Sequence, residues 1–154
     1  GRNAFEKCQS LEKFVASQSS SLKLIEDELF IECTSLIEVT LPPKVETIGW
    51  FAFYSCTNLS TLSIPSSVTE IKECAFGECT SLSNFEIPSS VKKIGKFVFK
   101  SCTSLKQIKI PSSITSLEDG TFSKCSSLTD VDIPSSVTSI GVDVFSETKV
   151  NFKQ

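Results

Sequence analysis

Hydrophobic and polar positions recur every 23 residues along this chain. Phenylalanine marks one column of the pattern, at Phe30, Phe53, Phe76, Phe99, Phe122 and Phe145. Cysteine, leucine and proline occupy other columns with the same step, beginning at Cys33, Leu36 and Pro42. Self-similarity with a period between roughly 20 and 50 residues indicates a solenoid, in which each repeat forms one coil.

The pattern inside one repeat predicts three short elements. Apolar and polar residues alternate toward the end of 82–87, which predicts a strand, and Pro88 ends it because proline cannot continue a hydrogen-bonded ladder. An apolar edge over 91–94 predicts a second short strand. Apolar residues at i, i+1 and i+4 over 98–102 predict one or two helical turns. Such a unit cannot bury its apolar side alone, so we expect the repeats to stack around one shared core.

The repeats predict a single domain over residues 1–154, made of about six units. The first repeat is looser, because Cys8 and Cys33 are 25 residues apart and two extra residues fall within 17–21. The chain opens inside a repeat and without methionine, so we expect a segment of a longer array. Uncapped coils at both ends predict contacts between two copies, and hence a homodimer.

One stretch carries a resemblance to a known family. Residues 128–145 read LTDVDIPSSVTSIGVDVF, with proline after the strand, and the earlier repeats add Phe-x-x-Cys on the turn. These features resemble the BspA-like leucine-rich repeat, and the resemblance extends from Phe5 to Phe145. It implies a right-handed α/β solenoid with a concave parallel β-sheet, short second strands and short helical turns. It also implies a surface protein that adheres to host cells and matrix proteins, although some protist relatives have no evident export route.

The strand alternation leaves two polar columns on the expected concave face, and these are our candidate ligand-binding residues. They are Glu38, Thr61, Asn84, Gln107 and Asp130 in the first column, and Thr40, Ser63, Glu86, Lys109 and Asp132 in the second. The simpler interpretation is a solvated sheet face with cross-strand pairs. In that case Glu86, Lys109 and Asp132 stack as acid, base and acid, each pair worth about 0.2–1 kcal/mol.

Composition excludes several classes of site. The chain has no histidine, so Ser/His and Cys/His catalytic pairs and histidine metal ligands are absent. Its net charge is −3 and no basic patch stands out, which disfavours nucleic acid as a partner. No apolar run approaches the roughly 18 residues that a membrane span needs.

The acidic residues do not form a convincing catalytic pair. Glu86 and Asp132 would lie ~9.6 Å apart by strand spacing, with Lys109 between them. An open sheet of this kind lacks the pocket that a glycosidase needs to raise the pKa of one carboxyl group. We therefore expect no enzymatic activity, no cofactor and no metal site.

The chain also contains seven cysteines and one N-glycosylation sequon. One cysteine per repeat, along a line, favours a ladder of buried thiols over a zinc site, which needs converging pairs. Rung spacing permits disulfides, whereas parallel side-chain directions disfavour them. Cys74 is an extra thiol outside the column. Asn58-Leu59-Ser60 is an N-glycosylation sequon on the turn before a strand, next to an expected core leucine.

The sequence is compatible with two functions. The first is a non-enzymatic binding module of a cell-surface or secreted protein, which adheres to host or neighbouring cells through a protein or glycan ligand. The alternative is a cytoplasmic scaffold for protein–protein interaction, which the seven mostly unpaired thiols suit. The upstream sequence separates the two, because a signal peptide favours the first.

Overall fold

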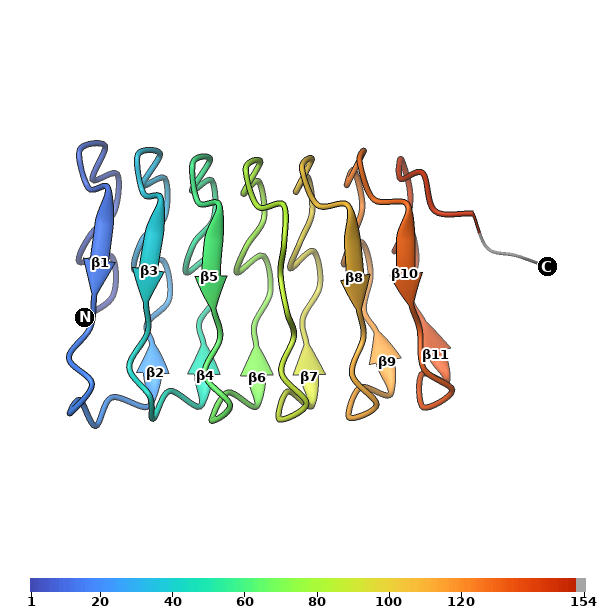
Figure 1. Ribbon diagram of the computed structural model, residues 1–154, viewed down its shortest axis with the longest axis horizontal. Helices are drawn as coiled ribbons and strands as arrows, with labels where there is room; N and C mark the ends of the chain where they lie inside the picture. Colours follow the sequence, from blue (N-terminus) through green and yellow to red (C-terminus); the bar gives the residue numbers. More distant parts are fainter. Residues whose placement is uncertain (152–154) are drawn as a thin grey trace.

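The structure, a computed structural model that describes residues 1–151, is a parallel β-solenoid of about six turns (Figure 1). A typical coil carries a long strand, a short strand and a turn segment. The long strands are β1 (Lys13–Val15), β3 (Glu38–Thr40), β5 (Thr61–Ser63), β8 (Gln107–Lys109) and β10 (Asp130–Asp132). The short strands are β2 (Leu24–Ile25), β4 (Thr47–Ile48), β6 (Glu70–Ile71), β7 (Lys93–Ile94), β9 (Ser116–Leu117) and β11 (Ser139–Ile140).

Strand register follows the sequence repeat. Glu38 pairs with Thr61, and Thr47 pairs with Glu70, so equivalent residues of successive repeats face each other. The first repeat obeys the same rule, because Lys13 pairs with Glu38 despite the longer spacing in sequence. The two extra residues are therefore absorbed between β1 and β2, in the serine-rich loop over 17–21.

One predicted long strand is missing. The strand predicted within 82–87 does not form. The backbone groups of residues 83–87 make no hydrogen bond within the described part of the chain, and the segment runs without regular structure between β5 and β8 (Figure 1). The side chain at this core position is Phe85, where neighbouring repeats have Leu62 and Ile108. Its ring lies 5.0 Å from the Phe76 ring and 4.8 Å from the Phe99 ring, measured between centroids. Ring size alone does not account for the break, because Phe14 occupies the same position in β1 and pairs in register with Val39.

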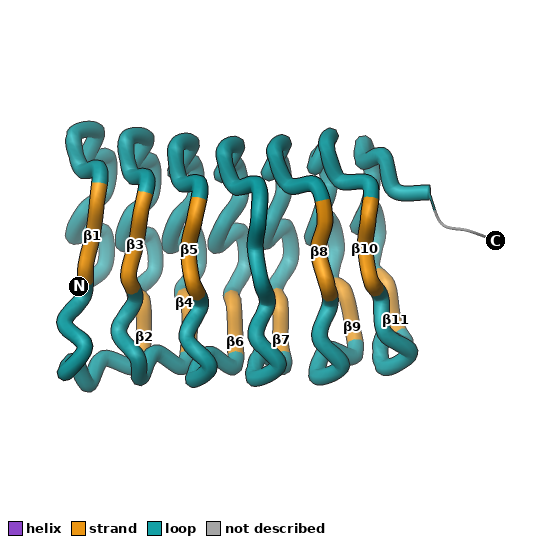
Figure 2. Tube along the Cα trace, viewed as in Figure 1, coloured by secondary structure: helices purple, strands orange, loops and turns teal. Residues whose placement is uncertain are grey.

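The predicted helical turns are also absent, since no helix is assigned anywhere in residues 1–151 (Figure 2). Two residues in each turn segment, four apart, have positive φ, such as Phe97 at 56° and Ser101 at 61°. Left-handed residues cannot belong to a right-handed helix. Alternate backbone N–H groups donate instead to the next coil, for example from Phe99 to the Thr121 carbonyl at 2.9 Å and from Ser101 to the Ser123 carbonyl at 2.8 Å. The turn segments thus form a third ladder between coils.

The core is a stack of equivalent side chains, as the columns predicted. Phenylalanine rings from successive coils lie 5.2–5.7 Å apart between centroids, at interplanar angles of 1–13°. The cysteines of the column are buried and unbridged. Each thiol donates a hydrogen bond to the phenylalanine carbonyl of the preceding coil, as from Cys102 Sγ to the Phe76 oxygen at 3.2 Å. These weak bonds tie each coil to its neighbour inside the core.

Glycine alternates with larger residues just after the short strands, and this spacing has a measurable consequence. A Cβ atom at Gly95 would lie 2.6 Å from the backbone nitrogen of Glu73 and 2.9 Å from the carbonyl carbon of Lys72. Backbone atoms cannot move aside as a flexible side chain can, so Gly95→Ala should destabilise the protein by about 1–3 kcal/mol. Urea unfolding measures the change. Glu118→Ala, at the equivalent position one repeat later, is the control and should change stability by less than about 0.5 kcal/mol.

Candidate functional site

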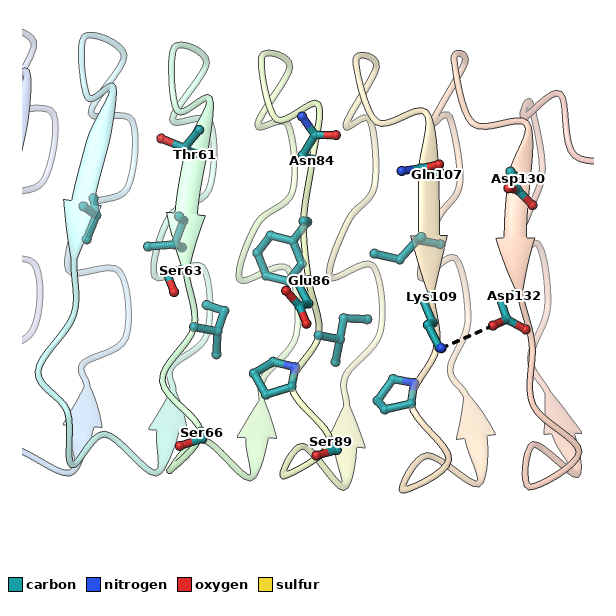
Figure 3. A pocket seen from close by; sticks show the side chains of 18 of the residues that line it. Thr61, Ser63, Ser66, Asn84, Glu86, Ser89, Gln107, Lys109, Asp130 and Asp132 are labelled. Carbon is teal, nitrogen blue, oxygen red and sulfur yellow. Dashed lines mark ion pairs between the residues drawn. The ribbon is translucent and has the colours of Figure 1, made fainter.

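The predicted binding residues lie together on one surface. We call this surface the long-strand face; it is the outward side of β3, β5, the segment 83–87, β8 and β10. An open groove of about 1220 Å³ runs across it (Figure 3). All ten candidates line the groove, namely Glu38, Thr40, Thr61, Ser63, Asn84, Glu86, Gln107, Lys109, Asp130 and Asp132. Nine of them are exposed and Thr40 is half-buried.

Strand alternation explains why these side chains point outward. Within β5, Thr61 and Ser63 are exposed while Leu62 between them is buried. The same pattern holds in β8, where Gln107 and Lys109 flank the buried Ile108. Because successive side chains of a strand point to opposite faces, the apolar residues join the core and the polar residues form the groove wall.

Charges on this face are only partly paired. Lys109 Nζ lies 3.9 Å from Asp132 Oδ2, and both side chains are largely exposed, so the pair contributes little to stability. The predicted stack of acid, base and acid is therefore half formed, because Glu86 has no ion pair within the described residues. The break in the ladder at 83–87 accounts for this, since Glu86 is not held in register with Lys109.

The groove carries a net negative charge. Its ten candidates include four carboxylates and one ammonium group, and neither Glu86 nor Asp130 forms an ion pair in residues 1–151. A second pair, between Lys13 Nζ and Glu38 Oε2 at 2.9 Å, lies at the N-terminal end of the face. The long-strand face thus offers free carboxylates beside hydroxyl and amide groups, which suits a ligand with basic and hydrogen-bonding groups.

The sequence reasoning missed the lower rim of the groove. Ser66, Ser89 and Ser112 line it together with Pro88 and Pro111. Figure 3 shows Ser66 and Ser89 below the strand side chains. The signal was present, because a serine follows the proline in most repeats, but those residues were assigned to a turn and not to a surface.

The thiols are poorly suited to reactive chemistry. Burial raises the pKa of the Cys33 thiol to about 11 and that of the Cys125 thiol to about 12. Burial also raises the pKa of the Cys79 and Cys102 thiols well above the ordinary value. A thiol that stays protonated at neutral pH is a weak nucleophile and a weak metal ligand. Consistent with this, no three acidic or thiol side chains in residues 1–151 converge to hold a metal ion.

Two further features bear on where the protein works. Asn58 is exposed and lies in the turn before β5, next to the buried Leu59, as the sequence predicted. Its glycosylation stays a prediction. None of the residues that the structure describes forms a helix able to cross a membrane.

Comparison with known proteins identifies related structures. A leucine-rich repeat protein of T. pallidum is 33% identical with a TM-score of 0.90, and the match covers 95% of this chain and 67% of that chain. A leucine rich cell surface protein of Faecalibacterium prausnitzii A2-165 is 27% identical with a TM-score of 0.52, covering 94% of this chain and 53% of that chain. A leucine-rich repeat protein of Eubacterium ventriosum, 17% identical with a TM-score of 0.53 over 94% of this chain and 61% of that chain, shares the fold alone.

The chain therefore spans 53–67% of the length of these three proteins. No curated protein matches it. The model of the BspA type leucine rich repeat region matches in six copies, over residues 1–72 and 46–153. Because these matches extend along almost the whole sequence, the chain belongs to the BspA-type leucine-rich repeat family.

Proposed function

We propose that this chain is a non-enzymatic binding module of a surface protein, and that its long-strand face holds a protein or glycan ligand during adhesion to host or neighbouring cells. Repeats of this type form a protein-binding fold. The observation that carries the proposal is the gathering of ten polar side chains from five successive coils in one open groove. The printed name of the F. prausnitzii relative, a cell surface protein, supports the location.

Binding on such a surface works through many weak contacts. Each of the five coils contributes two of the candidate side chains, so affinity grows with the number of coils that the ligand touches. The free carboxylates of Glu86 and Asp130 favour a ligand that presents basic groups. Because these groups are exposed, salt should weaken the interaction.

Reversing one charge in the groove tests this surface. Lys109→Glu should leave the thermal unfolding midpoint within about 2 °C, because Lys109 is exposed and its pair with Asp132 is weak. The same change should strengthen the binding of hexalysine at low salt and steepen its salt dependence. Lys92→Glu makes the same charge change outside the groove and is the control. Unfolding of the Lys109 variant would contradict the assignment of that side chain to the surface.

Cell location is tested separately. An antibody to this domain, applied to intact and unpermeabilised source cells, should stain their surface. A screen of matrix proteins and host glycans for saturable binding then identifies the ligand. Staining that requires permeabilisation would contradict adhesion and favour the cytoplasmic scaffold, which the seven free thiols suit because reducing compartments preserve them.

The coil ends support one further part of the proposal, a homodimer. Val15 and Leu22 are exposed in the first coil, and Ile140 and Val142 are exposed in the last. The edge strands β1, β2, β10 and β11 each pair on one side only within residues 1–151. Unpaired edges and exposed apolar residues favour contact with a second copy. Sedimentation of the purified chain at several concentrations measures this association.

A further inference from the structure

A second hollow lies away from the long-strand face, on the turn segments of the first coils. Its volume is about 370 Å³, and its lining consists of Arg2, Glu28, Trp50, Phe51 and Glu73. We call it the Trp50 pocket. Trp50 is the single tryptophan of the chain, and its side chain remains 48% exposed. The pocket therefore combines an accessible indole ring, a second aromatic ring and two carboxylates.

The fold does not require an aromatic ring at this position. Residues equivalent to Trp50 in other repeats include Asp27, Glu73, Lys96 and Asp119, which are all charged. The backbone of Trp50 is nevertheless fixed, because its N–H group donates to Asp27 Oδ1 at 2.9 Å. Only the last repeat places another apolar residue here, Val142. An exposed large aromatic residue on a rigid coil, at a position where four other repeats place charges, is typical of a binding anchor.

The ring already attracts a cation within the molecule. Lys72 Nζ lies over the Trp50 ring, 4.7 Å from its centroid. This distance is within the roughly 6 Å over which the quadrupole of an indole ring attracts an ammonium or guanidinium group. A ring that holds one cation on its face provides the same attraction to an incoming cation that displaces Lys72.

Charge in the pocket favours the same class of ligand. Arg2 lies 3.6 Å from Asp27, which offsets its positive charge. Glu28 accepts a hydrogen bond from the Asn3 amide, and neither Glu28 nor Glu73 forms an ion pair within residues 1–151. Two carboxylates beside an aromatic face form a site that selects a cation over a neutral group.

We propose that the Trp50 pocket holds the charged end of a lysine or arginine side chain from a partner protein. The site is separate from the long-strand face, so it does not depend on the function proposed for that face. It gives the protein a second contact surface, built from the turn segments. A partner that reaches both surfaces would bind more tightly than either surface allows alone.

The single tryptophan makes the test direct, because the indole N–H gives one NMR signal. We would titrate the protein with N-acetyl-lysine amide, with N-acetyl-arginine amide, and with N-acetyl-norleucine amide as the uncharged control. The basic probes should shift the indole signal in a saturable manner at millimolar concentration, and norleucine amide should not. Equal shifts with all three probes, or no saturable shift with either basic probe, would overturn the proposal.

Substitutions distinguish this site from general attraction to an acidic protein. Lys72→Ala removes the internal competitor and should tighten binding of the basic probes roughly two- to fivefold. Glu28→Gln combined with Glu73→Gln should weaken it by a similar factor. Lys92→Ala removes a lysine outside the pocket and should leave the affinity unchanged. If Lys72→Ala and Lys92→Ala have the same effect, the probes do not occupy the ring face and the assignment is wrong.

Discussion

Replacing Phe99 with alanine should lower the free energy of unfolding by about 3–5 kcal/mol. The Phe99 side chain is 0% exposed. Its ring stacks between those of Phe76 and Phe122, at 5.7 Å and 5.4 Å between centroids, and Phe85 packs against its edge at 4.8 Å. Removing it leaves a cavity that the neighbouring coils cannot close, because the ladder of the turn segments fixes the backbone beside it, for example from the Phe99 N–H to the Thr121 carbonyl at 2.9 Å.

Urea unfolding followed by circular dichroism measures the loss. Phe97→Ala is the matched control, because Phe97 lies in the same coil but on the surface, where its side chain is only partly buried. We expect its effect to stay below about 1 kcal/mol. Similar losses for the two substitutions would show that the phenylalanine column does not form the core.

Raising the pH above 9 should lower the free energy of unfolding steeply. Burial raises the pKa of the five column thiols, to about 11 for Cys33 and about 12 for Cys125, whereas the pKa in the unfolded chain stays near 9. The unfolded state therefore releases up to five protons that the native state keeps. Stability from this source is complete below pH 9 and falls as the pH rises, by roughly 5 kcal/mol in total between pH 9 and pH 10.

The measurement is the free energy of unfolding at half-unit steps from pH 8 to pH 10.5, under reducing conditions. Burial also raises the pKa of the Cys74 thiol, to about 11, so six thiols contribute to the slope above pH 9. Replacing Cys79 and Cys102 with alanine removes two of the six, so the slope should fall by about one third. Cys74→Ala removes one and is the graded control, which should lower the slope by about half as much. Equal slopes for all three proteins would mean that other groups cause the alkaline loss.

Much of the fold was predictable because every repeat carries the same pattern of side chains. Each column specifies one side-chain type at one place in the coil, so the register, the phenylalanine stack and the buried thiols all follow from the 23-residue period. The polar candidates were predictable for the same reason, since alternation in a short strand fixes which side chains face outward. Both inferences depend on periodicity alone.

The remaining features depend on backbone conformation and on single residues. Positive φ at Phe97 and Ser101 could not be foreseen, because neither residue type favours the left-handed region. The ladder between turn segments imposes it, and that ladder exists only once the coils have stacked. The missing strand at 83–87 was also not predictable, because the apolar pattern there matches that of the repeats that do form the strand, and Phe14 at the position of Phe85 lies in the paired strand β1. The Trp50 pocket was missed because its lining residues differ in type from one repeat to the next, so no column marks them.

The interrupted ladder at 83–87 has a consequence for cooperativity. On the short-strand side, β7 pairs with β6 but not with β9, and the buried Ser90 hydroxyl has no hydrogen-bond partner in the described residues. Between the coil of β7 and the coil of β9, the described residues form backbone hydrogen bonds only through the turn segments. In a linear array, stability is the sum of couplings between neighbours, and the weakest coupling sets where the array divides. We therefore expect two cooperative units, one on each side of this junction. Amide hydrogens at the junction should exchange through partial opening, without unfolding of the whole protein.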